Sequence, residues 1–87
     1  MIYLFTECGS DWAAGDTIYR AFKDEQKAKE YLADEFKKEV GLDLSAALSI
    51  KAINNDPDFV VSTTYCEIPT FNREVIYLMV KPIEVEA

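Results

Sequence analysis

The chain has 87 residues, of which 49% are hydrophobic and 29% charged, a composition typical of one globular domain rather than of a disordered chain. Sixteen acidic residues against nine basic ones give a formal net charge of −7, which argues against direct nucleic-acid binding because phosphate neutralisation needs clustered lysine and arginine. No apolar run reaches the ~18 residues that cross a bilayer, and residues 1–7 lack the features of a signal peptide, so we expect a single cytoplasmic domain over 1–87 with no membrane contact.

The first 22 residues predict two strands. Residues 2–6 and 17–22 are rich in β-branched and aromatic side chains, which favour strands. Between them, residues 8–16 contain two glycines and two aspartates, which favour a loop. The two strands can therefore pair as a hairpin with a long connection.

Residues 24–40 predict the clearest helix. Asp24 can cap its first N–H groups, and Gly41 lies where a left-handed residue would end it. Apolar residues recur at helical spacing and form one stripe, which consists of Ala28, Tyr31, Leu32, Phe36 and Val40.

Residues 42–55 fit two patterns. They can form a helix capped by Asp43 or Ser45, or an alternating strand. Their alanine content favours the helix, and Pro57 stops either element.

The second half predicts two more strands. Residues 59–68 are β-rich, 69–73 form a turn, and 74–80 are apolar on both alternations, as in an interior strand with both faces covered or nearly so. Pro82 is expected to limit pairing, with residues 83–87 as a tail or edge extension. The element order β-β-α-α-β-β predicts an α+β fold, with an antiparallel sheet of about four strands and one or two helices on one face.

Few residues of the sequence are candidates for catalysis or metal binding. Histidine is absent, which removes the usual general base and the zinc sites that need it, and two cysteines cannot build an all-cysteine site. We expect Cys8 and Cys66 to be reduced and structural. Glu7 with Glu67 or Glu74 could form an acid/base pair, but among sixteen acids such pairs arise by chance. We therefore predict a protein that is not an enzyme and uses no cofactor or metal.

Aromatic and acidic residues point instead to binding. Trp12, in a polar loop, is typical of an interface anchor, although it could equally cover the end of the core. The tyrosines of the predicted strands form a half-polar contact surface if they share the face away from the helices, and are core otherwise. Acidic residues are spread along the chain, either for solubility or to meet a basic surface. The candidate partner-binding residues are Asp11, Trp12, Asp16, Asp56, Asp58, Tyr65 and Glu67.

The first third of the chain contains a recognisable series of short motifs. These are Thr6–Glu7 at a strand end, Ser10–Asp11–Trp12 in a loop, Ile18 and Phe22 in a second strand, and Lys27–Tyr31 in a helix. In this respect residues 3–31 resemble the opening of small proteins of unknown function from phages and mobile elements. Residues 13–15 and the whole second half depart from that pattern. The resemblance implies a mobile-element origin and supplies no catalytic residue.

The leading hypothesis is a non-enzymatic acidic binding protein. By analogy with small acidic phage proteins, it would inhibit or modulate a host defence complex, as anti-CRISPR proteins do, through a partner with a basic surface. One alternative is a protein that binds or sequesters a small ligand in a pocket lined by Tyr31, Phe36 and Tyr65. Another is a structural domain that associates with itself, for instance as a homodimer through a sheet edge.

Overall fold

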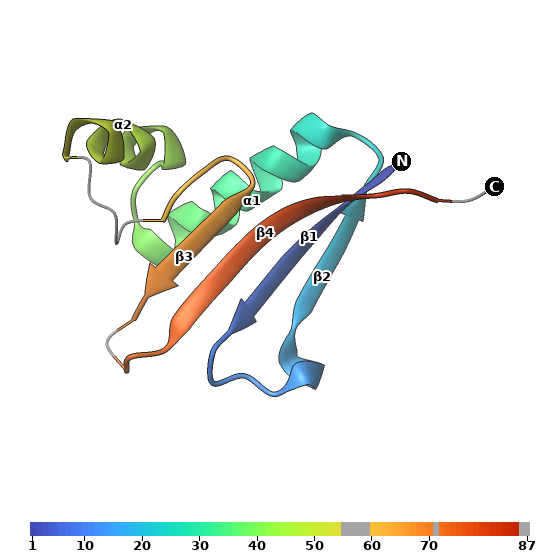
Figure 1. Cartoon of the computed structure of the whole chain (residues 1–87), viewed down its shortest axis with the longest axis horizontal. Coiled ribbons are helices and arrows are strands. Elements are labelled where there is room, and N and C mark those ends of the chain that lie inside the picture. Colours follow the sequence, from blue (N-terminus) through green and yellow to red (C-terminus); the bar gives the residue numbers. More distant parts are fainter. Residues whose placement is uncertain (55–59, 71, 86–87) are drawn as a thin grey trace.

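The computed structural model of the chain describes residues 1–54, 60–70 and 72–85. Within this part, four antiparallel strands form one sheet in the order β2 (Ile18–Phe22), β1 (Ile2–Gly9), β4 (Val75–Ile83) and β3 (Tyr65–Pro69), and two helices share a core with one of its faces (Figure 1). Along the chain the order is strand, strand, helix, helix, strand, strand. The predicted α+β fold class is therefore confirmed.

The N-terminal hairpin consists of β1 (Ile2–Gly9) and β2 (Ile18–Phe22). β1 is longer than predicted, because Cys8, which we expected in the loop, pairs with Tyr77 of β4 (Val75–Ile83). Local sequence favoured a loop from this point, and pairing with a strand distant in the sequence overrides it.

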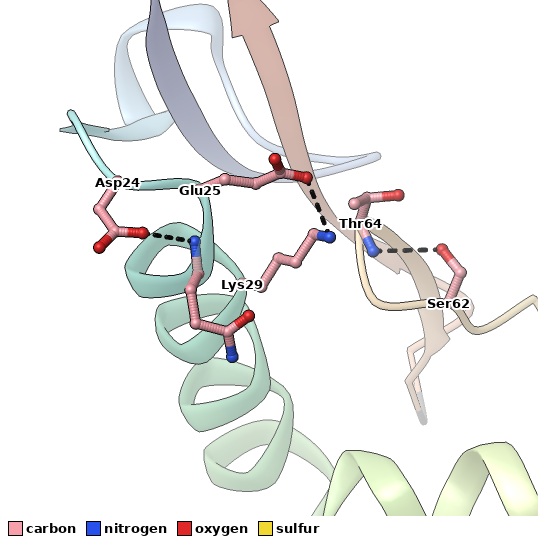
Figure 2. Close-up of polar contacts among 6 residues, drawn as sticks. Asp24, Glu25, Lys29, Ser62 and Thr64 are labelled. Atoms are coloured by element: carbon pink, nitrogen blue, oxygen red, sulfur yellow. Dashed lines mark hydrogen bonds and ion pairs between the residues drawn. The ribbon is translucent and has the colours of Figure 1, made fainter.

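The helix α1 (Glu25–Val40) begins and ends as predicted. The Asp24 carboxylate accepts a hydrogen bond from the backbone N–H of Gln26 at 2.8 Å (Figure 2), and Gly41 adopts a left-handed φ of 78°. The side chain of Val40 is wrongly assigned to the apolar stripe, since it is 42% exposed at the last turn. The fully buried members of the stripe are Ala28, Leu32 and Phe36.

The second helix, α2 (Leu44–Asn54), confirms the helical interpretation of this segment. The N–H of Ala47 donates to the carbonyl of Asp43 at 3.0 Å, so Asp43 rather than Ser45 stands at its N-terminal boundary. Leu44 and Ala47 are buried in the same core as α1 and the sheet.

The strand β3 covers Tyr65–Pro69, whereas the sequence predicted a strand over 59–68. Ser62 bends the chain before it: the Ser62 hydroxyl oxygen accepts hydrogen bonds from the N–H groups of Thr64 at 3.3 Å (Figure 2) and Tyr65 at 2.9 Å. The segment before this bend folds back alongside β3.

The strand β4 (Val75–Ile83) passes through Pro82, which we expected to limit pairing. Pro82 instead lies opposite Tyr3 of β1. β3 pairs with β4 only as far as the contact between Tyr65 and Met79, so beyond that point one side of β4 is an edge. A residue without an N–H group is tolerated at such an edge.

Only one face of β4 is covered by a helix in the described part. Ile76, Leu78 and Val80 are buried, while the alternate side chains of Tyr77 and Met79 are half-buried. The predicted interior position of this strand is confirmed, since β4 lies between β1 and β3, but among the described residues no helix covers its second face, where the alternate apolar side chains are half-buried.

The core predicts a clear difference between two positions on α1. Leu32→Ala removes a fully buried side chain and is expected to lower the free energy of unfolding by about 3 kcal/mol. Val40→Ala on the same helix is the matched control, expected to change it by less than about 0.5 kcal/mol. Urea denaturation monitored by circular dichroism measures both, and equal losses would contradict the buried stripe.

Candidate functional site

Three of the four strand tyrosines lie on the sheet face opposite α1. Successive side chains alternate across a sheet, and Thr6 lies next to the inward-facing Phe5, so it points away from the helices. Thr6 pairs with Tyr19 on one side and with Met79 on the other, and Met79 pairs with Tyr65. These four residues form one row across all four strands.

A second row runs parallel to the first. Cys8 pairs with Tyr77, and Tyr77 pairs with Glu67. Tyr3, by contrast, packs against the core on the helix side. The two rows define what we call the outer face: Thr6, Cys8, Tyr19, Tyr65, Glu67, Tyr77 and Met79.

The outer face is half polar and carries one internal hydrogen bond. The Tyr65 hydroxyl donates to Oε1 of Glu67 at 2.9 Å. This hydrogen bond is the main reason that the pKa of Tyr65 is raised. An aromatic surface with polar edges is typical of protein contact sites.

The β1–β2 loop (10–17) and the β3–β4 turn lie together at one end of the sheet, which we call the loop end (Figure 1). The N–H of Ser10 donates to the carbonyl of Val75 at 2.9 Å, and the N–H of Val75 donates to the Ser10 hydroxyl at 2.9 Å. This reciprocal pair fixes the loop to the start of β4.

Trp12 and Glu74 pack over the backbone of Gly9 at the loop end. A Cβ atom at Gly9 would overlap Oε1 of Glu74 and would lie 2.6 Å from both Cδ1 and Nε1 of the indole. Only glycine leaves space for this contact. Trp12 is half-buried, so part of its ring covers the sheet and part faces outward.

Glu7 is a carboxylate inside the core region, 5% exposed between β1 and α1. Burial raises its pKa, the negative charges of Glu35 and Glu39 raise it further, and Lys38 lowers it. Lys38 already forms an ion pair with Glu35 at 3.1 Å. Among the described residues, Oε1 of Glu7 has no hydrogen-bond partner, and the same is true of Oε1 of Glu74.

The predicted binding residues fall into separate places. Asp11 and Asp16 are exposed beside Trp12 in the loop, whereas Tyr65 and Glu67 lie on the outer face at the opposite edge of the sheet. Asp56 and Asp58 lie outside the described residues. The sequence analysis did not identify the role of Gly9, the burial of Glu7 or the contribution of Met79. The burial of Glu7 could have been inferred from its position two residues after Phe5, which places it on the inward face of β1.

The structure does not support two chemical alternatives. Glu67 lies on the opposite face from Glu7, so these residues are not an acid/base pair, and the charges that raise the pKa of Glu7 belong to α1 rather than to Glu74. The pocket expected between Tyr31, Phe36 and Tyr65 is wrong as well. The Tyr31 ring packs edge-on against Phe5 with centroids 4.8 Å apart, on the face away from Tyr65.

The cysteines, the potential metal ligands and the cavity between the helices also bear on which reactions and ligands the chain could support. Both cysteines are free, as predicted, and burial raises the pKa of the Cys66 thiol. No group of three or more acidic or cysteine side chains among residues 1–54, 60–70 and 72–85 is arranged to hold a metal ion. A shallow cavity of about 520 Å³ between the helices is lined in part by Ala33, Leu44 and Leu48.

Comparison with known proteins gives no assignment: the chain matches no protein-family model, no curated protein and no solved structure. Within the described part, neither helix is both long and apolar enough to cross a membrane.

The raised pKa of Glu7 predicts how stability changes with pH. Because its pKa is higher in the folded than in the unfolded chain, the folded protein holds the proton more tightly, and the free energy of unfolding falls as pH rises through the raised pKa. We expect Glu7→Gln to stabilise the protein by about 1 kcal/mol at pH 7, and by less near pH 4.

Urea titrations across this pH range measure the effect. Glu30→Gln, which removes the same charge from an exposed position on α1, is the control and should change the free energy of unfolding by less than about 0.5 kcal/mol. A Glu7→Gln benefit that is largest in acid would contradict the assignment.

The contact over Gly9 predicts a specific steric effect. Gly9→Ala is expected to destabilise the protein by about 1–3 kcal/mol and to move the Trp12 ring into solvent, with a red shift of its fluorescence. Gly15→Ala in the same loop is the control, since an added Cβ there meets nothing within 4 Å. Identical spectra for the Gly9→Ala variant and the native protein would rule out the contact.

Proposed function

We propose that this chain is a non-enzymatic binding protein that contacts a partner protein through the outer face of its sheet. The observation that carries the proposal is the row of Tyr19, Thr6, Met79 and Tyr65 across four strands, uncovered by either described helix. Tyrosine side chains lose little conformational entropy on binding, so the two tyrosines of this row make it an efficient contact surface.

The charge of the molecule supports a basic partner surface. The fold gathers at the loop end acidic residues that are distant in the sequence, and basic side chains there include Lys38 and Arg73, with Arg20 further along β2. The acidic residues of this end are Glu7, Asp11, Asp16, Glu35, Glu39 and Glu74. Such a field speeds association with a positively charged protein and repels nucleic acid.

A second copy of the chain is a less favourable occupant of the outer face. Each copy carries a formal net charge of −7, so a homodimer would bring two strongly acidic molecules together. The resemblance of residues 3–31 to phage and mobile-element proteins supports a role as an inhibitor or modulator of a host defence complex. We place such a protein in the cytoplasm of the host cell.

The proposal is tested by comparing proteins captured from a host-cell lysate by three forms of the chain. The outer-face variant is Tyr65→Ala with Tyr77→Ala. The control is Ile50→Ala with Ile53→Ala, which removes apolar side chains of α2 that are 42% and 81% exposed. We expect a basic protein that the native chain and the control retain, and that the outer-face variant binds at least about tenfold more weakly.

Salt and self-association complete the test. Retention should fall as the salt concentration rises, because the attraction between the acidic and basic surfaces is screened. Equal retention by the outer-face variant would contradict the proposal. If the native chain sediments as a dimer and the outer-face variant as a monomer, the outer face serves self-association instead.

A further inference from the structure

A small hollow lies at the loop end beside the buried carboxylates. Its volume is about 260 Å³, and Trp12, Asp16 and Ile18 line it. Ile18 of β2 pairs with Glu7 of β1, and both belong to the helix side of the sheet. The hollow is smaller than the ~300 Å³ of ordinary small-molecule pockets, so it suits a single side chain better than a whole ligand.

Acidic side chains outnumber basic ones around this hollow, where Arg20 lies on the same face of β2 two residues from Ile18. Only 5% of the surface of Glu7 is exposed, and its Oε1 has no hydrogen-bond partner among the described residues. Oε1 of Glu74 is buried without a partner as well. Lys38, the basic residue that lowers the pKa of Glu7, already forms an ion pair with Glu35. Buried polar atoms without partners are rare and call for a structural explanation.

The aromatic wall of the hollow is held rigidly. The Cδ1 and Nε1 edge of the Trp12 indole rests against Gly9, next to Glu74, and Ser10 ties the loop to β4. An indole ring with a carboxylate beside it attracts organic cations, since the ring face is electron-rich and the carboxylate supplies the opposite charge.

We propose that the hollow between Trp12, Asp16 and Ile18 binds one arginine or lysine side chain of the partner protein. Asp16 pairs with the incoming cation and the indole lies against it, while Glu7, opposite Ile18, and Glu74, beside Trp12, add negative potential. The inference rests on the proposed function only in assuming that a partner protein carries this side chain. Binding of the cation itself is tested separately.

Trp12 is the only tryptophan of the chain, so its fluorescence reports directly on the hollow. The probe is a capped tripeptide with arginine between two glycines, compared with the same peptide carrying neutral citrulline. We expect the arginine peptide to change the fluorescence with a Kd on the order of 1 mM, and the citrulline peptide to bind at least about tenfold more weakly. A lysine peptide shows which cation the hollow prefers.

Two aspartate variants separate a defined site from general attraction. Asp16→Asn removes a lining carboxylate, and Asp34→Asn removes the same charge from an exposed position on α1 that does not line the hollow. Asp16→Asn should weaken the arginine peptide about tenfold and Asp34→Asn less than about twofold. Glu7→Gln should weaken binding without unfolding the protein, which circular dichroism verifies.

Equal binding of the arginine and citrulline peptides would overturn the proposal, and so would equal effects of the two aspartate variants. These failures would not affect capture of a partner through the outer face. Conversely, loss of partner capture with intact arginine-peptide binding would contradict the proposed function alone.

Discussion

The structure depends on the packing of a single apolar stripe of α1 against one face of a four-stranded sheet. Leu32 and Phe36 meet Phe5 and Leu78 in a core that this helix and α2 close from one side. Two helices on one face leave the other face open, yet β4 carries apolar residues on both alternations. The exposed aromatic surface is therefore a consequence of the fold: the elements described by the structure cover only one side of the sheet, and the uncovered side is where an external partner can gain contact area.

Register and packing also explain how an evenly acidic sequence acquires a concentrated charge. Glu7 and Glu39 are separated by 32 positions, but the antiparallel hairpin and the diagonal course of α1 bring them to the same end of the sheet. Nearby lysines are largely engaged elsewhere, since Lys37 pairs with Asp43 at 3.2 Å and Lys38 with Glu35. Exposed ion pairs of this kind add little stability, but they leave the loop end with an excess of negative charge.

Elements determined by neighbouring residues could be predicted from the sequence, while features that require distant pairing could not. The limits of α1 follow from Asp24 and Gly41, whose capping geometry is local. The extension of β1 through Cys8 depends on β4, almost seventy residues away, and the placement of Pro82 depends on where β3 stops pairing. The candidate site depends still more on such contacts, because the buried state of Glu7 arises only when β1 and α1 come together. Alternation did predict that strand tyrosines could share a face, but only the register decided which of them do.

Gly9 connects the two proposed binding surfaces. Its position at the end of β1 lets the indole of Trp12 lie on the sheet, so the loop adds an aromatic side chain to the helix side. Cys8, the preceding residue, belongs to the outer face. Glu7, two residues before Gly9 on the same face of β1, is a residue whose burial opposes its own ionisation. An apolar side chain at Glu7 would stabilise the core more than a carboxylate with a raised pKa does. A carboxylate kept at this energetic disadvantage, opposite a residue that lines the hollow, supports the proposed recognition of a cation.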